Sequence, residues 1–443
     1  MKLLQNVRKT YYFLKRNGLR QTYYAVRERL TKRRSSYYYE APDVAELKRQ
    51  RTEFAGCDAS KYPLLSVVVP LFETREVFLR ELLASVLSQT YPFFEVILGD
   101  FSSDNQLKQV VEDYADARLK YHYFGDNKGI AENTNRAIDL VSGSYVGLLD
   151  HDDVLTEDAL YEVYQGITEE RRAGYQPLLL FSDEDKWTGE KGQYYSLHRK
   201  EEYNRELLFS GNYICHFMVM DTELIQKLRF RSQYSGAQDY DLVLRAVAKI
   251  EQMDKGSIRH IPKVLYHWRC HEGSSAENPV SKTYAYEAGK KALEDYFTKQ
   301  GIQAKVSHRL YVGLYQIDYE TDYFEARPEV GILGFALVER GVLVSGRLNL
   351  EGEVYYEGTK EGYTGYFHRA ILPQDAEAVD VRRMKLNPAC REVFKKITGC
   401  DYAEDEQGFC SNFRTLSQPE AVRLSLLLCQ AVRQAGYHII WQW

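Results

Sequence analysis

Short apolar, β-branched runs alternate with segments of helical periodicity between residues 65 and 181. The run Leu65–Phe72 is nearly all apolar, as expected for a strand that is buried on both faces of a parallel sheet. Similar runs follow at 94–100, 119–124, 145–149 and 177–181. Strands that alternate with helices form strand–helix–strand crossovers. The sequence therefore predicts an α/β fold, with a mostly parallel sheet and helices on both of its faces.

Acidic residues follow these strands at the point where each one ends. Ligands of parallel sheets bind beyond the carboxyl ends of the strands, and these ends carry Asp100, Asp150-His-Asp-Asp153 and Ser182-Asp-Glu-Asp185. Residues two apart in an extended segment point to the same side, so Asp150 and Asp152 can address one site. Clustered carboxylates repel unless a cation joins them, which favours Mg²⁺ or Mn²⁺ together with substrate phosphates. The alternative is a solvated turn that caps the helix expected near Thr156.

Several other classes of protein are disfavoured by what the sequence lacks. It has no G-x-x-x-x-G-K-[ST] loop and no well-placed G-x-G-x-x-G, so a metal-bridged nucleotide diphosphate explains the acidic edge better than a dinucleotide cofactor. Its seven cysteines form no C-x-x-C pair, which indicates reduced thiols in a cytoplasmic protein. No apolar run approaches the ~20 residues of a membrane-spanning helix, and no secretory signal pattern opens the sequence.

The N-terminal segment is strongly basic. Residues 1–34 contain eleven Lys or Arg and one acid, Glu28, although the whole chain has a net charge of −5. Apolar residues recur at helical spacing on both sides of Asn17-Gly18, which predicts two short amphipathic helices. Such a face can lie peripherally on the anionic inner face of the cell membrane, where each cation contributes about 1 kcal/mol. It can equally pack on the body with its cations in solvent, whereas the acidic body argues against nucleic acid.

Eight motifs follow one another in an order that resembles a known family. The chain is similar, over about residues 62–300, to family 2 inverting glycosyltransferases, which have the GT-A fold. The last three motifs resemble a branch found in bacterial surface-polysaccharide assembly, including rhamnan-type synthesis. The eight are Ser66-Val-Val-Val-Pro-Leu-Phe-Glu73, Ser85-Val-Leu-Ser-Gln-Thr-Tyr91, Phe94-Glu-Val-Ile-Leu-Gly-Asp100, Asp126-Asn-Lys-Gly-Ile-Ala131, Asp150-His-Asp-Asp153, Ser182-Asp-Glu-Asp-Lys186, Gly236-Ala-Gln-Asp-Tyr-Asp-Leu-Val-Leu-Arg245 and Ile261-Pro-Lys-Val-Leu-Tyr-His-Trp-Arg269.

The resemblance implies that several matching residues bind the nucleotide. Pro70 and Phe72 correspond to the lining of the nucleobase pocket, and Asn127 and Asn133 to the segment that borders ribose and base. Asp100 matches a carboxylate that reads the uracil or thymine edge. The family's usual Asp-Asp pair is Asp100-Phe101 in this chain, so an ungapped alignment places a phenylalanine at the base-reading position.

The resemblance also implies a metal site next to the bound donor. Asp150 is expected to hold the sugar-nucleotide and Asp152 the metal, Mn²⁺ or Mg²⁺. His267 matches a histidine that can complete the metal or diphosphate site. The alternative for His267 is a strand-end histidine that its neighbours cap.

Asp239 is the expected catalytic base. It belongs to Gln238-Asp239, where the family usually has Glu-Asp and the second acid carries the role. The acceptor hydroxyl attacks the anomeric carbon opposite the leaving diphosphate, and Asp239 takes the hydroxyl proton. The metal neutralises the charge that develops on the leaving phosphate, and one displacement inverts the anomeric centre. Alternatively, Asp239 only caps the helix expected over 240–249.

The pattern changes from about residue 305. Short strands separated by glycine turns lead to a helix over 417–435 and a closing strand over 437–443. This part resembles the acceptor-side half of a second glycosyltransferase domain. We therefore expect a basic helical arm over 1–60, a GT-A domain over 61–304, and a smaller, noncatalytic α+β module over 305–443 that packs on the domain or binds partners or glycan.

Two functions from different classes are compatible with this sequence. The first is a metal-dependent transfer of a sugar from a UDP- or dTDP-sugar donor to a glycan or lipid-linked acceptor, in bacterial cell-surface polysaccharide synthesis. The second is a catalytically inactive scaffold that binds nucleotide or glycan in a polysaccharide assembly complex. The departures at Phe101 and Gln238 and the truncated second domain favour the second function. The first function is favoured by four intact residues, Asp150, Asp152, Asp239 and His267.

Overall fold

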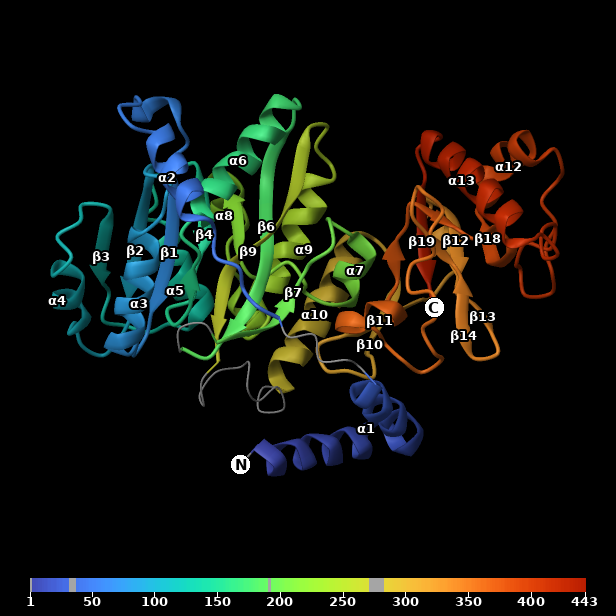
Figure 1. The fold of residues 1–443 in the computed structure, drawn as a ribbon, viewed down its shortest axis with the longest axis horizontal. Helices are drawn as coiled ribbons and strands as arrows, with labels where there is room; N and C mark the ends of the chain where they lie inside the picture. Colours follow the sequence, from blue (N-terminus) through green and yellow to red (C-terminus); the bar gives the residue numbers. More distant parts are fainter. Residues whose placement is uncertain (1, 32–36, 190–192, 271–282) are drawn as a thin grey trace. The chain divides into compact units, whose positions relative to one another are not determined.

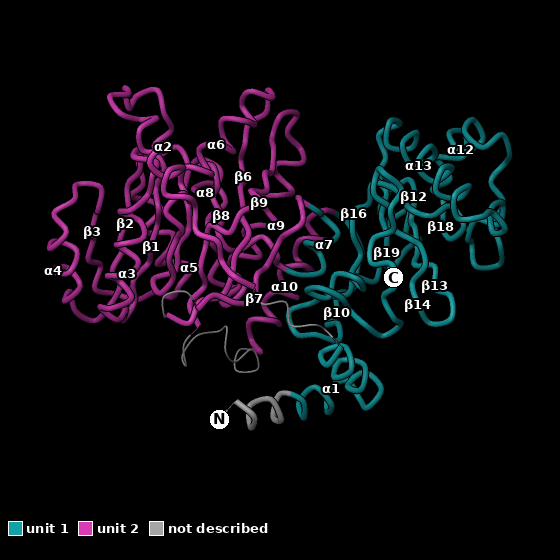
Figure 2. The backbone as a smooth tube through the Cα atoms, viewed as in Figure 1, with its two compact units in different colours: residues 1–35, 204–211, 301–443 teal, residues 36–203, 212–300 magenta. Residues whose placement is uncertain are grey.

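The computed structural model describes residues 2–31, 37–189, 193–270 and 283–443 (Figure 1). The chain divides into two compact units (Figure 2). Unit 2 consists of Ser36–Tyr203 and Asn212–Gln300, and unit 1 of Met1–Ser35, Asn204–Gly211 and Gly301–Trp443. The domain boundaries expected from the sequence, at 60/61 and 304/305, stay a prediction. The two compact units do not follow these predicted boundaries, because residues 36–60 belong to unit 2 and residues 204–211 to unit 1.

A nine-stranded sheet forms the centre of unit 2 within the described residues. Its order is β3-β2-β1-β4-β8-β6-β9-β5, and β7 pairs with β6 outside this order. The pairings make β1, β2, β3, β4, β6 and β9 run in one direction, with β5, β7 and β8 antiparallel to them. The strands are β1 Leu65–Leu71, β2 Phe94–Asp100, β3 Leu119–Tyr123, β4 Tyr145–Leu148, β5 Val154–Leu155, β6 Gln176–Trp187, β7 Tyr194–His198, β8 Met218–Asp221 and β9 Gly256–Arg269.

Helices cover both faces of this sheet. The first face carries α3, α4 and α6, whose apolar stripes share one core with Val67, Val69 and Leu98. Neighbouring strand residues point to opposite faces, and Gly99 therefore faces α5, where a Cβ atom would come within 3.2 Å of the Ala137 Cβ. The helices of unit 2 are α2 Val44–Glu53, α3 Glu76–Leu87, α4 Leu107–Glu112, α5 Ile130–Ile138, α6 Ala159–Arg172, α8 Thr222–Leu228, α9 Gln238–Ile250 and α10 Thr283–Lys299.

Unit 1 contains smaller sheets and its own helices. A four-stranded sheet has the order β16-β19-β12-β18. The described residues of this unit also form three separate two-stranded sheets, β10-β11, β13-β14 and β15-β17. Helix α13 begins with a capping box between Ser417 and Glu420. The elements are α1 Lys2–Thr31, α7 Arg205–Ser210, β10 Ala304–His308, β11 Tyr315–Tyr319, α11 Tyr323–Ala326, β12 Val330–Phe335, β13 Leu337–Glu339, β14 Val342–Ser345, β15 Arg347–Leu348, β16 Gln374–Asp375, β17 Ala378–Val379, β18 Met384–Leu386, α12 Arg391–Thr398, α13 Gln418–Gln434 and β19 His438–Gln442.

Helix α1 combines the two expected helices of the basic arm. Gly18 interrupts it with φ 76° and ψ 175°, at the point where Asn17-Gly18 predicted a stop. The Glu28 carboxylate accepts the backbone N–H groups of Thr364 at 3.0 Å and Gly365 at 2.8 Å. The second half of α1 is therefore packed on the rest of unit 1. Among the described residues, no helix has both the length and the apolar character that crossing a bilayer requires.

The predicted fold class is confirmed. The structure has a mostly unidirectional α/β sheet with helices on both faces, and a smaller unit of sheets and helices that includes the C-terminal region. The helix predicted over 417–435 is α13, and the closing strand is β19. The short strands predicted from about residue 305 begin with a hairpin, in which β10 pairs antiparallel with β11.

Candidate functional site

The turn after β4 places Asp150 beside His216, a residue that lies shortly before β8. Oδ2 of Asp150 is 3.8 Å from Nε2 of His216, and 55% of the Asp150 side chain is exposed. The other ring nitrogen of His216, Nδ1, is 3.2 Å from Oε2 of Glu184 in β6. The ring also stacks on Tyr266 of β9, at 4.9 Å between centroids. Four separate segments of the chain therefore meet at His216.

Glu184 is the buried centre of a network that supports His216. Its Oε2 accepts the backbone N–H of His216 at 2.6 Å, and its Oε1 lies 3.0 Å from Nδ1 of His198. The Lys200 ammonium is 3.8 Å from Oε2. Burial by itself would raise the pKa of Glu184, but the Lys200 charge and the hydrogen bonds from both histidines hold that pKa well below its usual value. Glu184 is therefore a carboxylate at neutral pH.

This network determines the charge of His216. Burial by itself would lower the pKa of His216, but the hydrogen bond and charge of Glu184, with the charges of Asp150 and Asp153, raise it to about 9. His216 is therefore an imidazolium at neutral pH, directly beside the exposed carboxylate of Asp150. Sequence reasoning missed both His216 and Glu184. The run Ser182-Asp-Glu-Asp185 was a signal for Glu184, but His216 stands in no motif that pointed to it.

Asp239 lies in the first turn of α9, and its side chain is half-buried. Nδ2 of Asn212 donates a hydrogen bond to its Oδ2 at 3.1 Å. Loss of hydration raises the pKa of Asp239, and the charges of His216 and Asp150 act on that pKa in opposite directions. Asp150, His216 and Asp239 therefore belong to one electrostatic neighbourhood. The residue at the N-cap position of α9 is Ala237.

The remaining acids of the turn have different environments. Asp153 is fully buried, where its Oδ1 accepts the backbone N–H of Arg269 at 2.6 Å and its Oδ2 accepts the Tyr266 hydroxyl. Nε of Arg269 also donates to the backbone oxygen of Asp152, whose side chain is half-buried. Burial, with the charges of Asp152 and Asp150, raises the pKa of Asp153 well above its usual range. Asp153 anchors the turn, and the carboxylate of Asp150 stays exposed.

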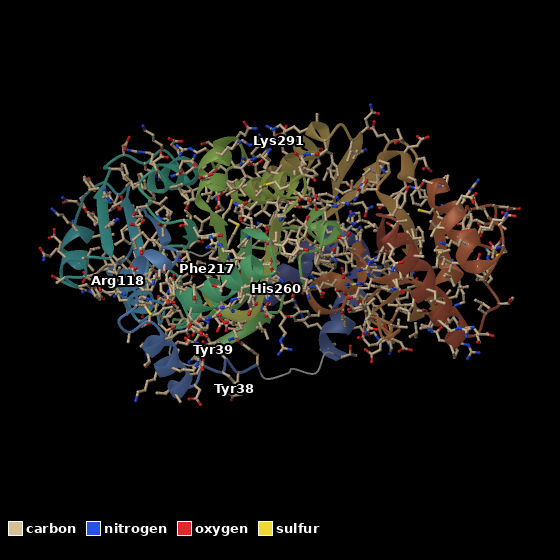
Figure 3. The ribbon with its side chains drawn as sticks, turned by 90° about the horizontal axis from the view of Figure 1, so that it is seen from above. Tyr38, Tyr39, Arg118, Phe217, His260 and Lys291 are labelled. Carbon is tan, nitrogen blue, oxygen red and sulfur yellow. The ribbon has the colours of Figure 1, made fainter. Side chains whose placement is uncertain are left out.

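His267 lies on the opposite side of β9 from Tyr266, because neighbouring strand residues point to opposite faces. Its Nδ1 is 2.6 Å from Oδ1 of Asp185 in β6. Its ring packs edge-on against Tyr39, at 4.5 Å between centroids (Tyr39 is labelled in Figure 3). Since Tyr266 is the residue that stacks on His216, His267 faces away from His216.

The expected base-reading residues are turned into the protein. Asp100 is fully buried, and its two carboxylate oxygens accept the Tyr121 hydroxyl at 2.6 Å and the backbone N–H of Ser102 at 2.9 Å. The neighbouring Phe101 is also buried and stacks on Phe124, at 4.6 Å between ring centroids. Asp100 therefore has hydrogen-bond partners inside the fold on both of its oxygens.

The other predicted nucleotide contacts lie at the end of β1, in the loop after β3 and in α5. Oδ1 of Asn127 accepts a hydrogen bond from Nδ2 of Asn133 at 2.8 Å, so the structure brings this predicted pair together. Asn133 is buried in α5. Pro70 is half-buried in β1, and Phe72, which directly follows β1, is 45% exposed.

The carboxylates of the turn fit a cation that is shared with a substrate. Within the described part of the chain, no group of three or more His, Cys, Asp or Glu could hold a metal ion by itself. Mg²⁺ is usually held by only one or two carboxylates, with waters and substrate phosphates as its other ligands. The carboxylates of Asp152 and Asp150 are ligands of this kind, so they fit a cation that binds together with a diphosphate.

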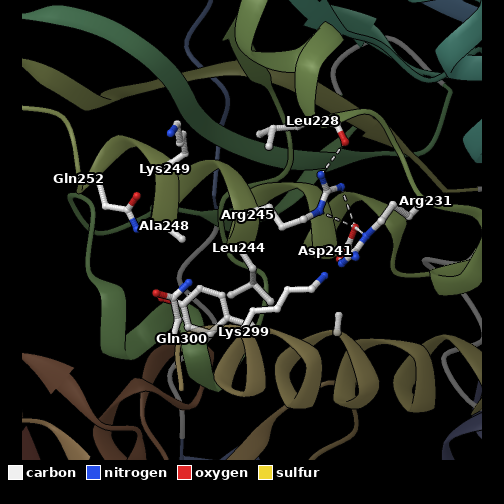
Figure 4. A pocket seen from close by; sticks show the side chains of 12 residues that line it. Leu228, Arg231, Asp241, Leu244, Arg245, Ala248, Lys249, Gln252, Lys299 and Gln300 are labelled. Atoms are coloured by element: carbon white, nitrogen blue, oxygen red, sulfur yellow. Dashed lines mark hydrogen bonds and ion pairs between the residues drawn. The ribbon is translucent and has the colours of Figure 1, made fainter. Parts of the chain in front are cut away.

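A separate hollow of about 220 Å³ lies between α9 and α10 (Figure 4). Asp241 holds two guanidinium groups there, and Nη2 of Arg245 lies 2.7 Å from its Oδ2. Arg245 also donates to the backbone oxygen of Leu228 at 2.6 Å. None of the site residues predicted from the sequence lines this hollow, which belongs to the packing of the two helices.

Comparison with known proteins identifies the region that carries the site. Residues 66–229 match the profile of Glycosyl transferase family 2. An uncharacterized protein of Sinorhizobium fredii, y4gI, is 39% identical over 241 residues, which are 54% of this chain and 26% of that protein. The O-antigen biosynthesis protein RfbC of Myxococcus xanthus is 32% identical over 252 residues, which are 56% of this chain and 19% of that protein. The chain thus spans about a quarter or less of the length of these relatives.

Among solved structures, that of S. aureus TarS 1–349 is 21% identical with a TM-score of 0.40, covering 52% of this chain and 64% of that one. The matched segment 66–229 begins in β1 and includes the turn after β4, Glu184 and His216. This part of the chain is a Glycosyl transferase family 2 domain.

Proposed function

We propose that the protein is a metal-dependent, inverting glycosyltransferase. It would transfer a sugar from a UDP- or dTDP-sugar to a glycan or lipid-linked acceptor. The observation that carries the proposal is the clustering, around a family 2 domain, of an accessible carboxylate, Asp150, a cation, His216, and a candidate base of raised pKa, Asp239. Such groups with perturbed pKa values gather at functional sites more often than elsewhere.

Asp239 is the proposed general base. The acceptor hydroxyl forms a bond to the anomeric carbon while the bond from that carbon to the diphosphate oxygen breaks. The hydroxyl proton passes to the Asp239 carboxylate, and the electron pair of the broken bond leaves with the diphosphate. The hydrogen bond from Asn212 orients the Asp239 carboxylate. Loss of hydration raises its pKa, which makes it a stronger base than an ordinary aspartate.

The turn after β4 is the proposed donor site. Asp150 would hold the sugar-nucleotide, and Asp152 would hold Mn²⁺ or Mg²⁺ together with the diphosphate. A bound cation would neutralise negative charge on the leaving group. The His216 imidazolium adds a protein cation beside Asp150, which offsets the carboxylates of the turn as a diphosphate approaches. His267 is not part of this proposal, because it faces away from His216 and contacts Asp185.

The nucleobase would lie near Phe72, Pro70 and the Asn127–Asn133 pair. Phe72 is an exposed aromatic ring at the end of β1, on which a base could stack. Asp100 would act indirectly, since both of its oxygens are already hydrogen-bonded inside the fold. We therefore propose that it positions the loop at Ser102 and does not read the base itself.

The biological setting is proposed from the names of relatives. Besides RfbC, they include the E. coli protein WcaA, a putative colanic acid biosynthesis glycosyl transferase that is 29% identical over 212 residues. Another is a Campylobacter jejuni glucosyltransferase that acts on an undecaprenol-linked glycan, 29% identical over 181 residues. We propose the same setting here, bacterial cell-surface polysaccharide synthesis on the cytoplasmic side of the membrane.

Helix α1 is the proposed membrane contact. Its second half is held on unit 1 by Glu28, yet Leu19 and Leu30 are about 80% exposed. Exposed apolar residues among Lys and Arg suit an anionic lipid surface. The protein is expected to sediment with vesicles that contain phosphatidylglycerol and not with purely zwitterionic vesicles. Equal binding to both kinds would contradict an electrostatic contact.

A thermal-shift panel tests the donor site. UDP, dTDP, GDP and CMP are added with and without Mn²⁺ to the wild type and to Asp152→Ala. A ligand at 100 times its dissociation constant stabilises the folded state by about 2.7 kcal/mol, which a melting curve resolves readily. Metal-dependent stabilisation by UDP or dTDP that Asp152→Ala abolishes supports the proposal. Stabilisation by no nucleotide contradicts the proposed donor site and favours the alternative function, in the form of a scaffold that binds glycan.

A further inference from the structure

Unit 1 contains a cavity of about 300 Å³ that the family 2 domain does not explain. This volume lies at the lower end of the range, about 300–1,000 Å³, that is typical of small-molecule sites. Helix α7 and strand β11 form its main walls, with contributions from α11 and β19. Its lining residues are Glu206, Phe209, Ser210, Arg309, Tyr315, Gln316, Ile317, Asp318, Tyr319, Thr321, Tyr323, Pro373 and Gln442.

A buried ion pair holds one lining residue of the cavity, Glu206, in place. Nη2 of Arg327 is 2.5 Å from Oε1 of Glu206, and both side chains are nearly inaccessible to solvent. Nη1 of the same guanidinium donates to the Tyr319 hydroxyl at 2.7 Å. Tyr323 packs edge-on against Tyr319, at 5.3 Å between ring centroids. The aromatic side of the cavity is therefore fixed in position before any ligand binds, which lowers the entropic cost of binding.

Arg309 supplies a charged donor to the cavity. Its Nε donates to the backbone oxygen of Tyr315 at 2.9 Å, and its Nη1 to that of Ile371 at 3.2 Å. Burial lowers the pKa of Arg309 to about 10, and the Asp318 charge only partly offsets this effect. Within the described residues, no carboxylate forms an ion pair with this guanidinium. Arg309 therefore keeps hydrogen-bonding capacity for a ligand.

The other polar groups of the lining combine donors with acceptors. Asp318 is exposed and can only accept hydrogen bonds when ionised, whereas the amides of Gln316 and Gln442 can do both. A ligand with several hydroxyl groups matches this set, since each hydroxyl is both a donor and an acceptor. A phosphate fits less well, because the negative charge of Asp318 would repel it although the Arg309 guanidinium would attract it. A lipid chain also fits less well, because it would leave the polar groups of the lining without hydrogen-bond partners.

We propose that this cavity binds a neutral saccharide unit of a glycan. The faces of the tyrosine rings would contact the C–H groups of the sugar ring, and Arg309, Gln316 and Asp318 would bind its hydroxyls. The inference goes beyond the proposed transferase function, because it requires no turnover and uses only residues of unit 1. The chain also links the cavity to the other site. Gly211, which ends the α7 segment, is followed by Asn212, whose amide donates to Asp239.

Saturation-transfer NMR on the full chain tests the proposal. The probes are the methyl glycosides of glucose, galactose, rhamnose and N-acetylglucosamine, with methyl glucuronide as an anionic comparison. The test variant is the double substitution Gln316→Ala with Asp318→Asn. Its matched control is Gln407→Ala with Asp401→Asn, which changes the same residue types at exposed positions of unit 1 outside the cavity.

At least one neutral glycoside is expected to bind to the wild type and to the control. The double variant should bind it roughly tenfold more weakly, because it loses hydrogen bonds to the sugar, one of them to a charged group. The double variant changes only residues of unit 1, so weaker binding in it assigns the signal to this cavity, and binding should be unchanged in Asp239→Asn. The proposal is overturned if no neutral glycoside binds, if only the glucuronide binds, or if the double variant and its control bind equally. Loss of binding in Asp239→Asn would also overturn it, because the signal would then come from unit 2.

Discussion

The charge of His216 can be tested without knowing the substrate. The structure raises the pKa of His216 from an ordinary 6.5 to about 9, mainly through Glu184. Since one pKa unit corresponds to 1.36 kcal/mol, the fold favours the imidazolium by about 3 kcal/mol. A histidine whose pKa is raised on folding adds stability below its unfolded pKa. This contribution should therefore be complete below pH 6.5 and disappear as the pH rises through about 9.

The perturbation is Glu184→Gln, which keeps the shape of the side chain and removes its charge. The pKa of His216 is expected to fall toward its ordinary value or below it, because burial then acts with less opposition. The assay is an NMR titration of histidine ring carbons labelled with ¹³C, with the His216 resonance assigned from its absence in His216→Gln. His260 serves as an internal control, since its pKa is raised by Asp183, at 2.8 Å, and Glu202 instead. Figure 3 labels this residue.

Three outcomes would refute this reasoning. The first is a wild-type His216 that titrates near 6.5. The second is a Glu184→Gln variant in which the pKa of His216 is unchanged. The third outcome concerns stability. We expect the difference in unfolding free energy between the wild type and His216→Gln to shrink by about 3 kcal/mol between pH 6 and pH 10. A pH-independent difference would show that the fold does not favour the imidazolium.

Three further predictions concern catalysis and stability. The transfer rate should rise with pH through the raised pKa of Asp239, so its acid limb should lie above the ordinary carboxyl value of 3.8, as a pH–rate profile will measure. Arg327→Ala leaves the Glu206 carboxylate buried without its partner and should cost about 3–5 kcal/mol in denaturant unfolding, whereas Arg391→Ala, at an exposed pair, should cost about 0–1 kcal/mol. Phe54→Ala removes a buried ring from an aromatic cluster and should cost about 3–5 kcal/mol in the same assay.

The central part of the fold could be predicted because its signals are local. A buried parallel strand must be apolar along its whole length, so Leu65–Leu71 and Phe94–Asp100 are visible in the sequence. The strand before Asp150, β4, could be predicted in the same way, because it is also a short apolar run. Gly18 could be predicted as a break in the basic helix, because glycine readily adopts the positive φ that it has there.

The candidate site could be predicted only in part, because some of its residues meet through tertiary contacts. Asp150 and Asp239 stand in motifs, but His216 acquires its role from Glu184, which lies 32 residues before it and on another strand. Likewise, the helical segment Arg205–Ser210 belongs to unit 1, where its Glu206 pairs with Arg327 across 121 residues of sequence. Periodicity and motif spacing do not encode pairings of this kind.

Sugar-nucleotide turnover tests the central proposal most directly. Purified protein with Mn²⁺ is incubated with a panel of UDP- and dTDP-sugars and a mixture of bacterial lipid-linked and soluble glycans, and release of the nucleoside diphosphate is measured. The wild type is expected to release UDP or dTDP in the presence of acceptor. Asp239→Asn should be slower by about 10²- to 10⁴-fold with unchanged nucleotide binding, as expected for loss of a general base. Turnover in Asp239→Asn at the wild-type rate would contradict the assignment of the base, and nucleotide binding without any turnover would favour the inactive scaffold.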